Sequence, residues 1–198
     1  AERHSRVQRG VRHCEEKLEV GFAVNNAFAK GGEGAVLMSD MYALTAIENL
    51  ATYLPRAVKD GKDMEARTHV AFGNTLSGVV MCLTLITSEH ALEHALSAYH
   101  PALPHGAGLI MISRAYYKYF IERHACDERF VRMAQAMGMP EATRPEDFLT
   151  ALTRLQEACG VADLKMSDYG ITPDEFETLM MMRMPCICMH GKYFRIGY

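Results

Sequence analysis

The 198-residue sequence predicts an all-α fold, a multi-helix, bundle-like domain. From Met38 onward, apolar residues recur at the three- and four-residue spacing of one helix face. Glycine and proline separate these periodic segments, and no segment alternates with period two for long. The composition, 49% apolar and 23% charged, is that of a globular protein, so the helices are expected to pack around a common core.

The first predicted helix covers residues 39–54, with Ser39 as its N-cap. Pro55 is expected to end this helix, because proline lacks the amide hydrogen that continues the helical ladder. Pro55 can also start a short second helix, which Gly61 would terminate.

A longer helical segment follows over residues 63–100, with Asp63 as its N-cap. Gly73 and Gly78 lie inside this segment. They indicate either the close approach of another helix or an interruption.

Pro101 and Pro104 favour an extended loop, after which the helical pattern resumes. The remaining predicted helices are residues 106–124, a helix capped by Asp127 and ended by Gly138, and residues 144–159. Thr172 and Glu175 then form a capping box around Pro173.

The periodic pattern divides the chain into three segments. The helical domain is predicted over residues 38–179. Residues 1–37 begin arginine-rich, show no sustained periodicity and are interpreted as an atypical N-terminal appendage. Residues 180–198 form an atypical methionine-rich tail, and the cluster "LMMMRMPCICM" at its start is apolar on every face.

The bulk composition limits the partners and the compartment. A formal net charge of −3 and a pI near 6.3 provide no basic field for binding nucleic acid. No apolar run reaches about 18 residues, so no membrane span is expected. The six cysteines lack the spacing of a disulfide framework, which favours a reducing, cytoplasmic compartment.

Four histidines lie within "SEHALEHALSAYHPALPHG", residues 88–106. His90 and His94 are four positions apart and therefore share one face of a helix. His105 follows a proline-stiffened loop, and "PHG" allows the chain to turn this imidazole back toward the helix. Three imidazoles so placed can share a metal ion or line one pocket.

The same segment contains the inverted zinc-peptidase motif H-x-x-E-H. In that interpretation His90 and His94 bind zinc, Glu93 is the general base, and Glu175 or Glu177 provides a third ligand. Otherwise Glu93 is a surface carboxylate, and Glu175 serves only in its capping box.

A longer stretch of sequence favours a different interpretation. The segments "MSDMYALTAIENL", "LPRAVKDGKDMEAR", "AFGNTLSGVV", "HALEHALSAYHPALPHGAGLIM" and "MAQAMGM" together resemble the helical C-terminal domain of the iron-dependent alcohol dehydrogenases. The resemblance runs from about Met38 to Leu179 in the order of that family. Its most specific part is H-x3-H followed by P-H-G.

The resemblance implies a metal-assisted hydride transfer. In that family one aspartate and three histidines hold a divalent metal, commonly iron or zinc, which polarises the oxygen of a small alcohol or aldehyde. NAD or NADP, bound to an N-terminal Rossmann-like domain, exchanges a hydride with the substrate carbon. Carried onto this chain, the resemblance implies His90 and His105 as metal ligands and His94 as the residue that helps to move the proton. Fe²⁺ or Zn²⁺ is therefore the expected metal, and NAD(P) is expected only together with the family's N-terminal domain.

Part of the family's pattern is missing from this sequence. The remaining aspartate and histidine ligands are expected near residues 20–26, where the chain reads "VGFAVNN", and Asp40 is the first aspartate. The glycine-serine phosphate loop of the nucleotide-binding domain is also missing. The chain is therefore expected to be a domain fragment with a partial metal site, weak or inactive by itself.

Two alternatives stay open beside the oxidoreductase: a non-catalytic helical module and the H-x-x-E-H zinc peptidase. A homodimer is a further expectation, because apolar helix faces that another domain would cover favour association.

Overall fold

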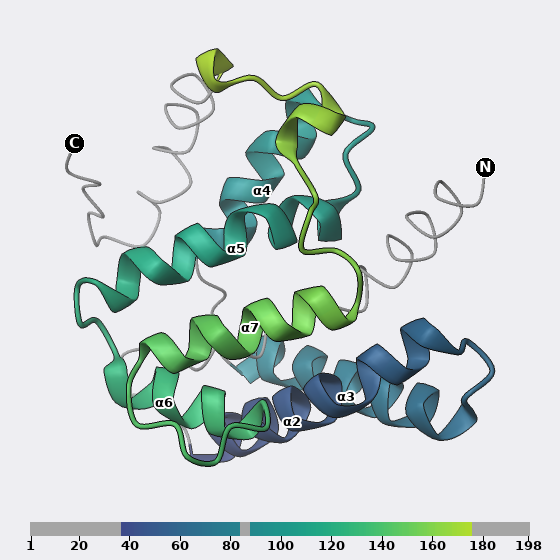
Figure 1. The fold of residues 1–198 in the computed structure, drawn as a ribbon, viewed down its shortest axis with the longest axis vertical. Coiled ribbons are helices and arrows are strands. Elements are labelled where there is room, and N and C mark those ends of the chain that lie inside the picture. The colour runs from purple at the N-terminus through teal and green to yellow at the C-terminus, as the bar shows by residue number, and fades with distance from the viewer. Residues whose placement is uncertain (1–36, 84–87, 176–198) are drawn as a thin grey trace.

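The computed structural model describes residues 37–83 and 88–175, and all regular structure in these residues is helical (Figure 1). The α-helices are α2 (Leu37–Lys59), α3 (Met64–Leu83), α4 (Ser88–Tyr99), α5 (His105–Ile121), α6 (Asp127–Ala136) and α7 (Glu146–Ala158). Two short 3₁₀ helices, η1 (Met166–Tyr169) and η2 (Pro173–Glu175), follow α7. The prediction of an all-α fold is confirmed. The predicted appendage and tail lie largely outside the described residues.

Helices α2 and α3 form a closely packed hairpin along one side of the molecule (Figure 1). A Cβ atom built at Gly73 would lie 3.0 Å from Leu50 Cγ and 3.3 Å from the Ala46 carbonyl oxygen. Gly73 therefore marks a close helix approach, one of the two explanations expected for the glycines of this segment. Gly78 has no neighbour within 4 Å of the same point.

Helix α2 is longer than the sequence predicts. Pro55 lies inside it, so the prediction that this proline ends the first helix is wrong. The missing amide removes one helical hydrogen bond, but Leu50, Leu54 and Ala57 are buried on both sides of the proline. Burial of one continuous face outweighs that local loss. Ser39 is a buried residue within α2 rather than its N-cap.

The other helix ends follow the predicted signals in part. Asp63 caps α3 as predicted, because its Oδ1 accepts a hydrogen bond of 3.0 Å from the Ala66 amide. Helix α6 has Cys126 at its N-cap and Asp127 as its first residue, so the predicted cap is displaced by one position. Gly138 follows α6 with a φ of +91°, a left-handed conformation that ends the helix and favours glycine.

The main core lies where α5, α6 and α7 cross, and it continues onto α2. Tyr117, Phe130 and Phe148, one from each of the three crossing helices, place their ring centroids 5.2–6.3 Å apart. Phe130 and Phe148 have no exposed surface, and Ile47 and Leu50 of α2 complete the cluster. Tyr117 meets both phenylalanine rings edge-on, and such contacts add directional packing energy to the burial of apolar area.

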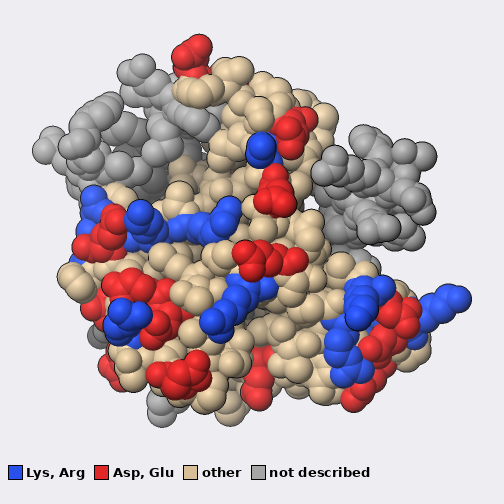
Figure 2. Space-filling view, viewed as in Figure 1, with Lys and Arg blue, Asp and Glu red and all other residues tan. Residues whose placement is uncertain are grey.

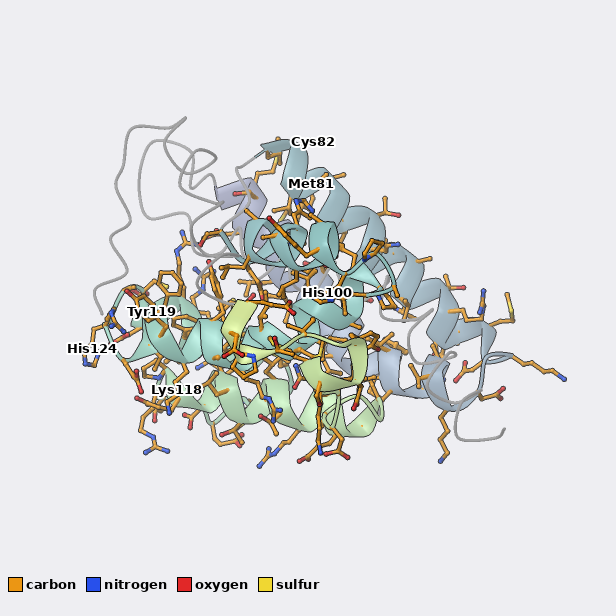
Figure 3. The ribbon with its side chains drawn as sticks, turned by 90° about the horizontal axis from the view of Figure 1, so that it is seen from above. Met81, Cys82, His100, Lys118, Tyr119 and His124 are labelled. Carbon is orange, nitrogen blue, oxygen red and sulfur yellow. The ribbon has the colours of Figure 1, made fainter. Side chains whose placement is uncertain are left out.

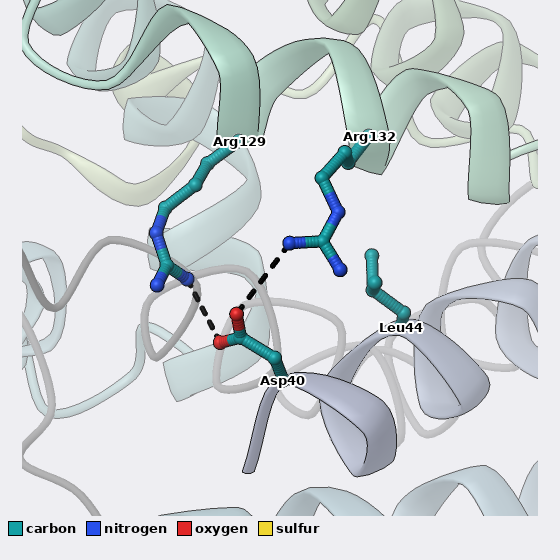
Figure 4. A pocket seen from close by; sticks show the side chains of 4 residues that line it. All are labelled: Asp40, Leu44, Arg129 and Arg132. Atoms are coloured by element: carbon teal, nitrogen blue, oxygen red, sulfur yellow. Dashed lines mark hydrogen bonds and ion pairs between the residues drawn. The ribbon is translucent and has the colours of Figure 1, made fainter. Parts of the chain in front are cut away.

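An ion pair links α2 to α6 beside this core (Figure 4). Arg129 Nη1 donates to Asp40 Oδ1 at 2.8 Å, and Arg132 Nη1 lies 3.6 Å from Asp40 Oδ2. Leu44 completes a small pocket with these three residues. The Asp40 carboxylate is therefore engaged by two guanidinium groups and serves in helix packing.

A second, smaller core cluster lies at the end of α4 and the start of α5. Leu96, Leu103 and Ala107 pack there against Ile171, which comes from the segment between η1 and η2. The segment after α7 is therefore held against the α4–α5 pair, as Figure 1 also shows.

The face of the molecule in Figure 2 carries charges of both signs close together. At the α2–α3 turn, for example, Arg56 Nη2 lies 2.9 Å from Asp63 Oδ2 and 2.6 Å from Glu65 Oε2. Within residues 37–83 and 88–175, no single helix has the length and hydropathy needed to cross a membrane. Helices α3 and α4 pass that test of length and hydropathy only when they are taken together, and the pair is bent by 104°.

Candidate metal centre

Helices α4 and α5 bring three histidines together. His90 and His94 lie one turn apart on α4, and His105 is the first residue of α5. The ring centroids are 5.5 Å apart for His90 and His105, 5.1 Å for His94 and His105, and 6.4 Å for His90 and His94. The short loop that carries Pro101 and Pro104 therefore turns His105 back onto α4.

The three imidazoles differ in burial. His90 is 1% exposed, His105 is half-buried, and His94 is exposed. Burial, reinforced by the neighbouring His105 and His94, lowers the pKa of His90 to about 4. Burial also lowers the pKa of His105. His90 and His105 are therefore neutral at pH 7, which is the protonation state that binds a metal.

Glu93 lies between the two α4 histidines in sequence and has no exposed surface. Its Oε2 is in contact with His105 Nδ1, and its Oε1 accepts a hydrogen bond from the Ser97 hydroxyl. As the alternative to a peptidase base, the sequence predicted that Glu93 is a surface carboxylate. This prediction is wrong. The carboxylate is buried because it finds two partners on its own helix and on α5.

Gly108 provides the space for this buried carboxylate. A Cβ atom at that position would lie 2.7 Å from Glu93 Cγ and 2.9 Å from Glu93 Oε1. Real Cβ atoms essentially never come so close, so any side chain at this position would displace Glu93. The absence of a side chain on α5 thus allows α4 to bring Glu93 against His105.

A second buried carboxylate lies one turn earlier on α4. Glu89 is 1% exposed, and its Oε2 accepts a hydrogen bond of 2.6 Å from the Tyr117 hydroxyl. Burial, followed by the nearby Glu89, raises the pKa of Tyr117 well above its ordinary value, so this hydroxyl keeps its proton. Glu89 and Glu93 are therefore both buried carboxylates of α4, and each makes a separate contact with α5.

The donor set fits a divalent metal ion. Two imidazoles that share an ion through nitrogens at about 2.0–2.1 Å have ring centroids roughly 5 Å apart. The distances of His105 to His94 and to His90 are close to that value. Within the described residues, the group whose ligand atoms all lie within 4.8 Å of one another consists of Glu93, His94 and His105, without His90.

The other described histidines are engaged elsewhere. His69 stacks on Tyr53 with ring centroids 3.8 Å apart. His100 Nε2 lies 2.6 Å from Glu175 Oε2, and His124 Nδ1 lies 2.8 Å from Asp127 Oδ2. Figure 3 places His124 at the end of α5 that is farther from His100.

The roles of Glu93, Ser97 and Gly108 were not predicted from the sequence. One signal could have revealed them: positions 89, 93 and 97 are spaced by four, so they lie on the same face as the buried Leu96. Two carboxylates on a buried stripe require partners on the facing helix. The remaining expected ligands, near residues 20–26, lie outside the described residues.

The fold is that of the helical half of known alcohol dehydrogenases. An archaeal halo-thermophilic alcohol dehydrogenase from a Red Sea brine pool superposes with a TM-score of 0.74 at 26% identity, covering 86% of this chain and 42% of that one. An alcohol dehydrogenase from Oenococcus oeni superposes with a TM-score of 0.76 over 91% of this chain and 46% of its own, and its 22% identity supports the fold alone.

Curated relatives match more than half of this chain. The long-chain primary alcohol dehydrogenase AdhA of Thermoanaerobacter ethanolicus is 29% identical over 152 residues, which are 73% of this chain and 36% of that protein. The mitochondrial hydroxyacid-oxoacid transhydrogenase of Homo sapiens is 26% identical over 123 residues, which are 56% of this chain and 26% of that protein. The matched regions thus span about a third or less of these relatives' own length.

Residues 32–196 match the model of the Fe-containing alcohol dehydrogenase family, C-terminal, and the chain belongs to this family. The family resemblance expected from the sequence is confirmed. The match extends beyond residue 179 into the methionine-rich segment, and the proposed boundaries at residues 38 and 179 stay a prediction.

Proposed function

We propose that this chain provides the metal-binding helical part of an NAD(P)-dependent alcohol or aldehyde oxidoreductase. The observation that supports this most directly is the convergence of His90, His94 and His105, with ring centroids 5.1–6.4 Å apart. Membership of the Fe-containing alcohol dehydrogenase family agrees with it. The matched region is only a part of the curated relatives. We therefore propose, rather than infer from these relatives, that the chain belongs to an enzyme with this activity.

His90 and His105 are the proposed ligands of Fe²⁺ or Zn²⁺. His90 is buried and His105 half-buried, and both are neutral at pH 7, so neither must lose a proton before it binds. When bound, the ion supplies a Lewis acid that polarises the oxygen of a small alcohol or aldehyde. His94 and Glu93 also offer ligand atoms beside His105.

His94 is the proposed proton-transfer residue. It is exposed, and its ring centroid lies 5.1 Å from that of His105, so it can exchange protons with both solvent and a substrate hydroxyl near the cluster. NAD(P) is the proposed hydride partner. We place its binding outside the described helices, in a nucleotide-binding domain of the kind that the resemblance implies.

The zinc-peptidase alternative finds no support in the geometry. A general base must reach a metal-bound water, whereas both oxygens of Glu93 are engaged with Ser97 and His105. Glu175, the proposed third ligand, lies against His100 instead, and Glu177 lies outside the described residues. The non-catalytic module remains the alternative that a metal-binding experiment must separate from the oxidoreductase.

Titration of the metal-free full chain with Zn²⁺, followed by isothermal calorimetry, tests the proposed site. We expect saturable binding of one ion, and we expect the His90→Ala, His105→Ala double variant to bind at least tenfold more weakly. The affinity should lie below that of a complete four-ligand site, because two or three imidazoles provide fewer bonds.

His124→Ala is the matched control, since it removes an exposed histidine from the far end of α5. This variant should bind zinc as the wild type does. If the wild type binds no zinc, the metal site is wrong and the non-catalytic module is favoured. If the double variant binds as tightly as the wild type, the ligands lie elsewhere in the chain.

A further inference from the structure

We infer that Glu93 is a positioning residue, which holds His105 as the tautomer with hydrogen on Nδ1 and thereby leaves Nε2 free for a ligand. No feature of the H-x3-H and P-H-G pattern requires this role. The consequence for metal binding rests on the proposed function, whereas the tautomer itself does not.

The two oxygens of Glu93 have separate partners. Ser97 donates its hydroxyl hydrogen to Oε1, and His105 Nδ1 is in contact with Oε2. We take Glu93 as an ionised carboxylate, which only accepts hydrogen bonds, so the hydrogen of the second contact is on Nδ1. A fully buried carboxylate with two donors is adequately satisfied, which explains why Glu93 can be buried.

The tautomer decides which nitrogen of His105 can bind an ion. A neutral imidazole carries one hydrogen, on either Nδ1 or Nε2. With hydrogen on Nδ1, the lone pair is on Nε2. Metal-binding histidines usually donate their other N–H to a carboxylate or carbonyl in this way, and loss of that partner costs 10- to 100-fold in affinity.

The competing role for Glu93 is that of a direct ligand, since its carboxylate lies within 4.8 Å of ligand atoms of His94 and His105. The contacts favour the positioning role. If His105 binds the ion through Nε2, Oε2 in contact with Nδ1 lies on the opposite side of the ring and does not reach the same ion. Gly108 lies against the Glu93 side chain so closely that not even a methyl group fits between them, which restricts movement of the carboxylate.

Nitrogen NMR of the histidine side chains in the metal-free full chain tests the inference directly. We expect His105 to carry its hydrogen on Nδ1 in the wild type and in Glu93→Gln, whose amide oxygen can still accept. Glu93→Met keeps the volume but has no oxygen, and it should lose this tautomer preference. A wild-type His105 with its hydrogen on Nε2 would overturn the inference.

Glu89→Gln is the matched control, because it alters the other buried carboxylate of α4, which bonds to Tyr117. It should leave the His105 tautomer unchanged. Circular dichroism identifies any variant that fails to fold. Ser97→Ala removes only the donor to Oε1 and therefore provides a milder test. This variant should keep the hydrogen of His105 on Nδ1. If the hydrogen moved to Nε2 in this variant, the assignment would be contradicted.

Metal titrations distinguish positioning from ligation. If Glu93 positions His105, Zn²⁺ should bind about 10- to 100-fold more weakly to Glu93→Met, and Glu93→Gln should recover most of the affinity. The visible spectrum of bound Co²⁺ should be the same in the wild type and Glu93→Gln. Equal loss of affinity in both variants, with a changed cobalt spectrum, would identify a direct ligand and overturn the inference. A wild type with the expected tautomer but no metal binding would contradict only the proposed function.

Discussion

At Gly108 the chain has no room for a side chain, since a Cβ atom would lie 2.7 Å from Glu93 Cγ. The glycine is not required by its backbone angle, because it lies within the regular helix α5. It is required by the neighbouring carboxylate. One missing methyl group thus determines how closely Glu93 and His105 can approach each other.

We predict that Gly108→Ala destabilises the protein by about 1–3 kcal/mol, the usual cost of overpacking a filled site. Alanine's better helix propensity would contribute only about 0.5–1 kcal/mol in the opposite direction. Urea unfolding of the variant and the wild type measures the difference. Unchanged or increased stability would mean that Glu93 can move away without loss.

Gly78→Ala is the control for this prediction, because nothing lies within 4 Å of its added Cβ atom and the residue is exposed in the middle of α3. This substitution should stabilise the protein by roughly 0.5–1 kcal/mol through helix propensity alone. If Gly108→Ala lowers the stability and Gly78→Ala raises it, the steric effect at Gly108 is separated from the intrinsic helix propensity of alanine.

Residue spacing predicted part of this site. The four-residue interval between His90 and His94, and the prolines before His105, were enough to expect three imidazoles together. Glu93 was not predicted, because a glutamate is ordinarily solvent-exposed and only its facing helix reveals its partners. Gly108 could not be identified either, since its role depends on a contact with another helix.

At the scale of single elements, α7 begins with a cap formed from within the helix. Asp147 is the second residue of α7, and its Oδ2 accepts hydrogen bonds of 3.0 Å from the amides of both Thr143 and Arg144. These bonds, the Arg144 amide first, hold the pKa of Asp147 below its ordinary value of 3.8. The carboxylate therefore fixes the turn that leads into the helix.

We predict that Asp147→Ala lowers stability at neutral pH and that the loss disappears in acid. A carboxyl group whose pKa is lower in the folded state stabilises the fold above its unfolded pKa, near 3.8, and loses this effect as the pH falls through the folded value. Urea unfolding of the variant and the wild type, at pH 7 and at pH 3 or below, measures this difference in stability. Glu146→Ala, which changes an exposed neighbour, should lower the free energy of unfolding by less. If Asp147→Ala were still less stable than the wild type in acid, the prediction would be contradicted.

Proline and capping residues predicted the helix boundaries less well where the burial of apolar residues favoured a longer helix. Pro55 is a strong stop signal, yet α2 continues through it because apolar residues on both sides enter one core. Asp63 has no such conflict, and the predicted cap is present. Periodicity therefore identified the helices, while some boundaries depended on tertiary packing that a single sequence does not contain.

At the scale of the whole molecule, one partly buried contact connects distant parts of the chain. His100 follows α4 directly, and its Nε2 lies 2.6 Å from Glu175 Oε2, 75 positions later in sequence. Ile171 packs into the small core near Leu96 and Leu103 at the same end of the molecule. The segment after α7 thus covers the loop that presents His105.

We predict that His100→Ala destabilises the protein by about 1 kcal/mol, as expected for loss of one partly buried hydrogen bond. Hydrogen exchange should accelerate in residues 161–175 while the amides of α2 and α3 stay protected. His124→Ala, which removes an exposed contact with Asp127, should change neither quantity. Equal acceleration throughout the protein would show that the contact supports the whole fold rather than this segment.

The three clustered histidines come from only 16 consecutive positions, 90–105, although they belong to two helices. Closing so short a loop costs little chain entropy, and contacts of this kind form faster than pairings between distant segments. The α4–α5 corner can therefore assemble before the rest of the domain. An ion bound by this corner would also be held by partly folded chains, so it would stabilise the native state by less than its affinity alone suggests.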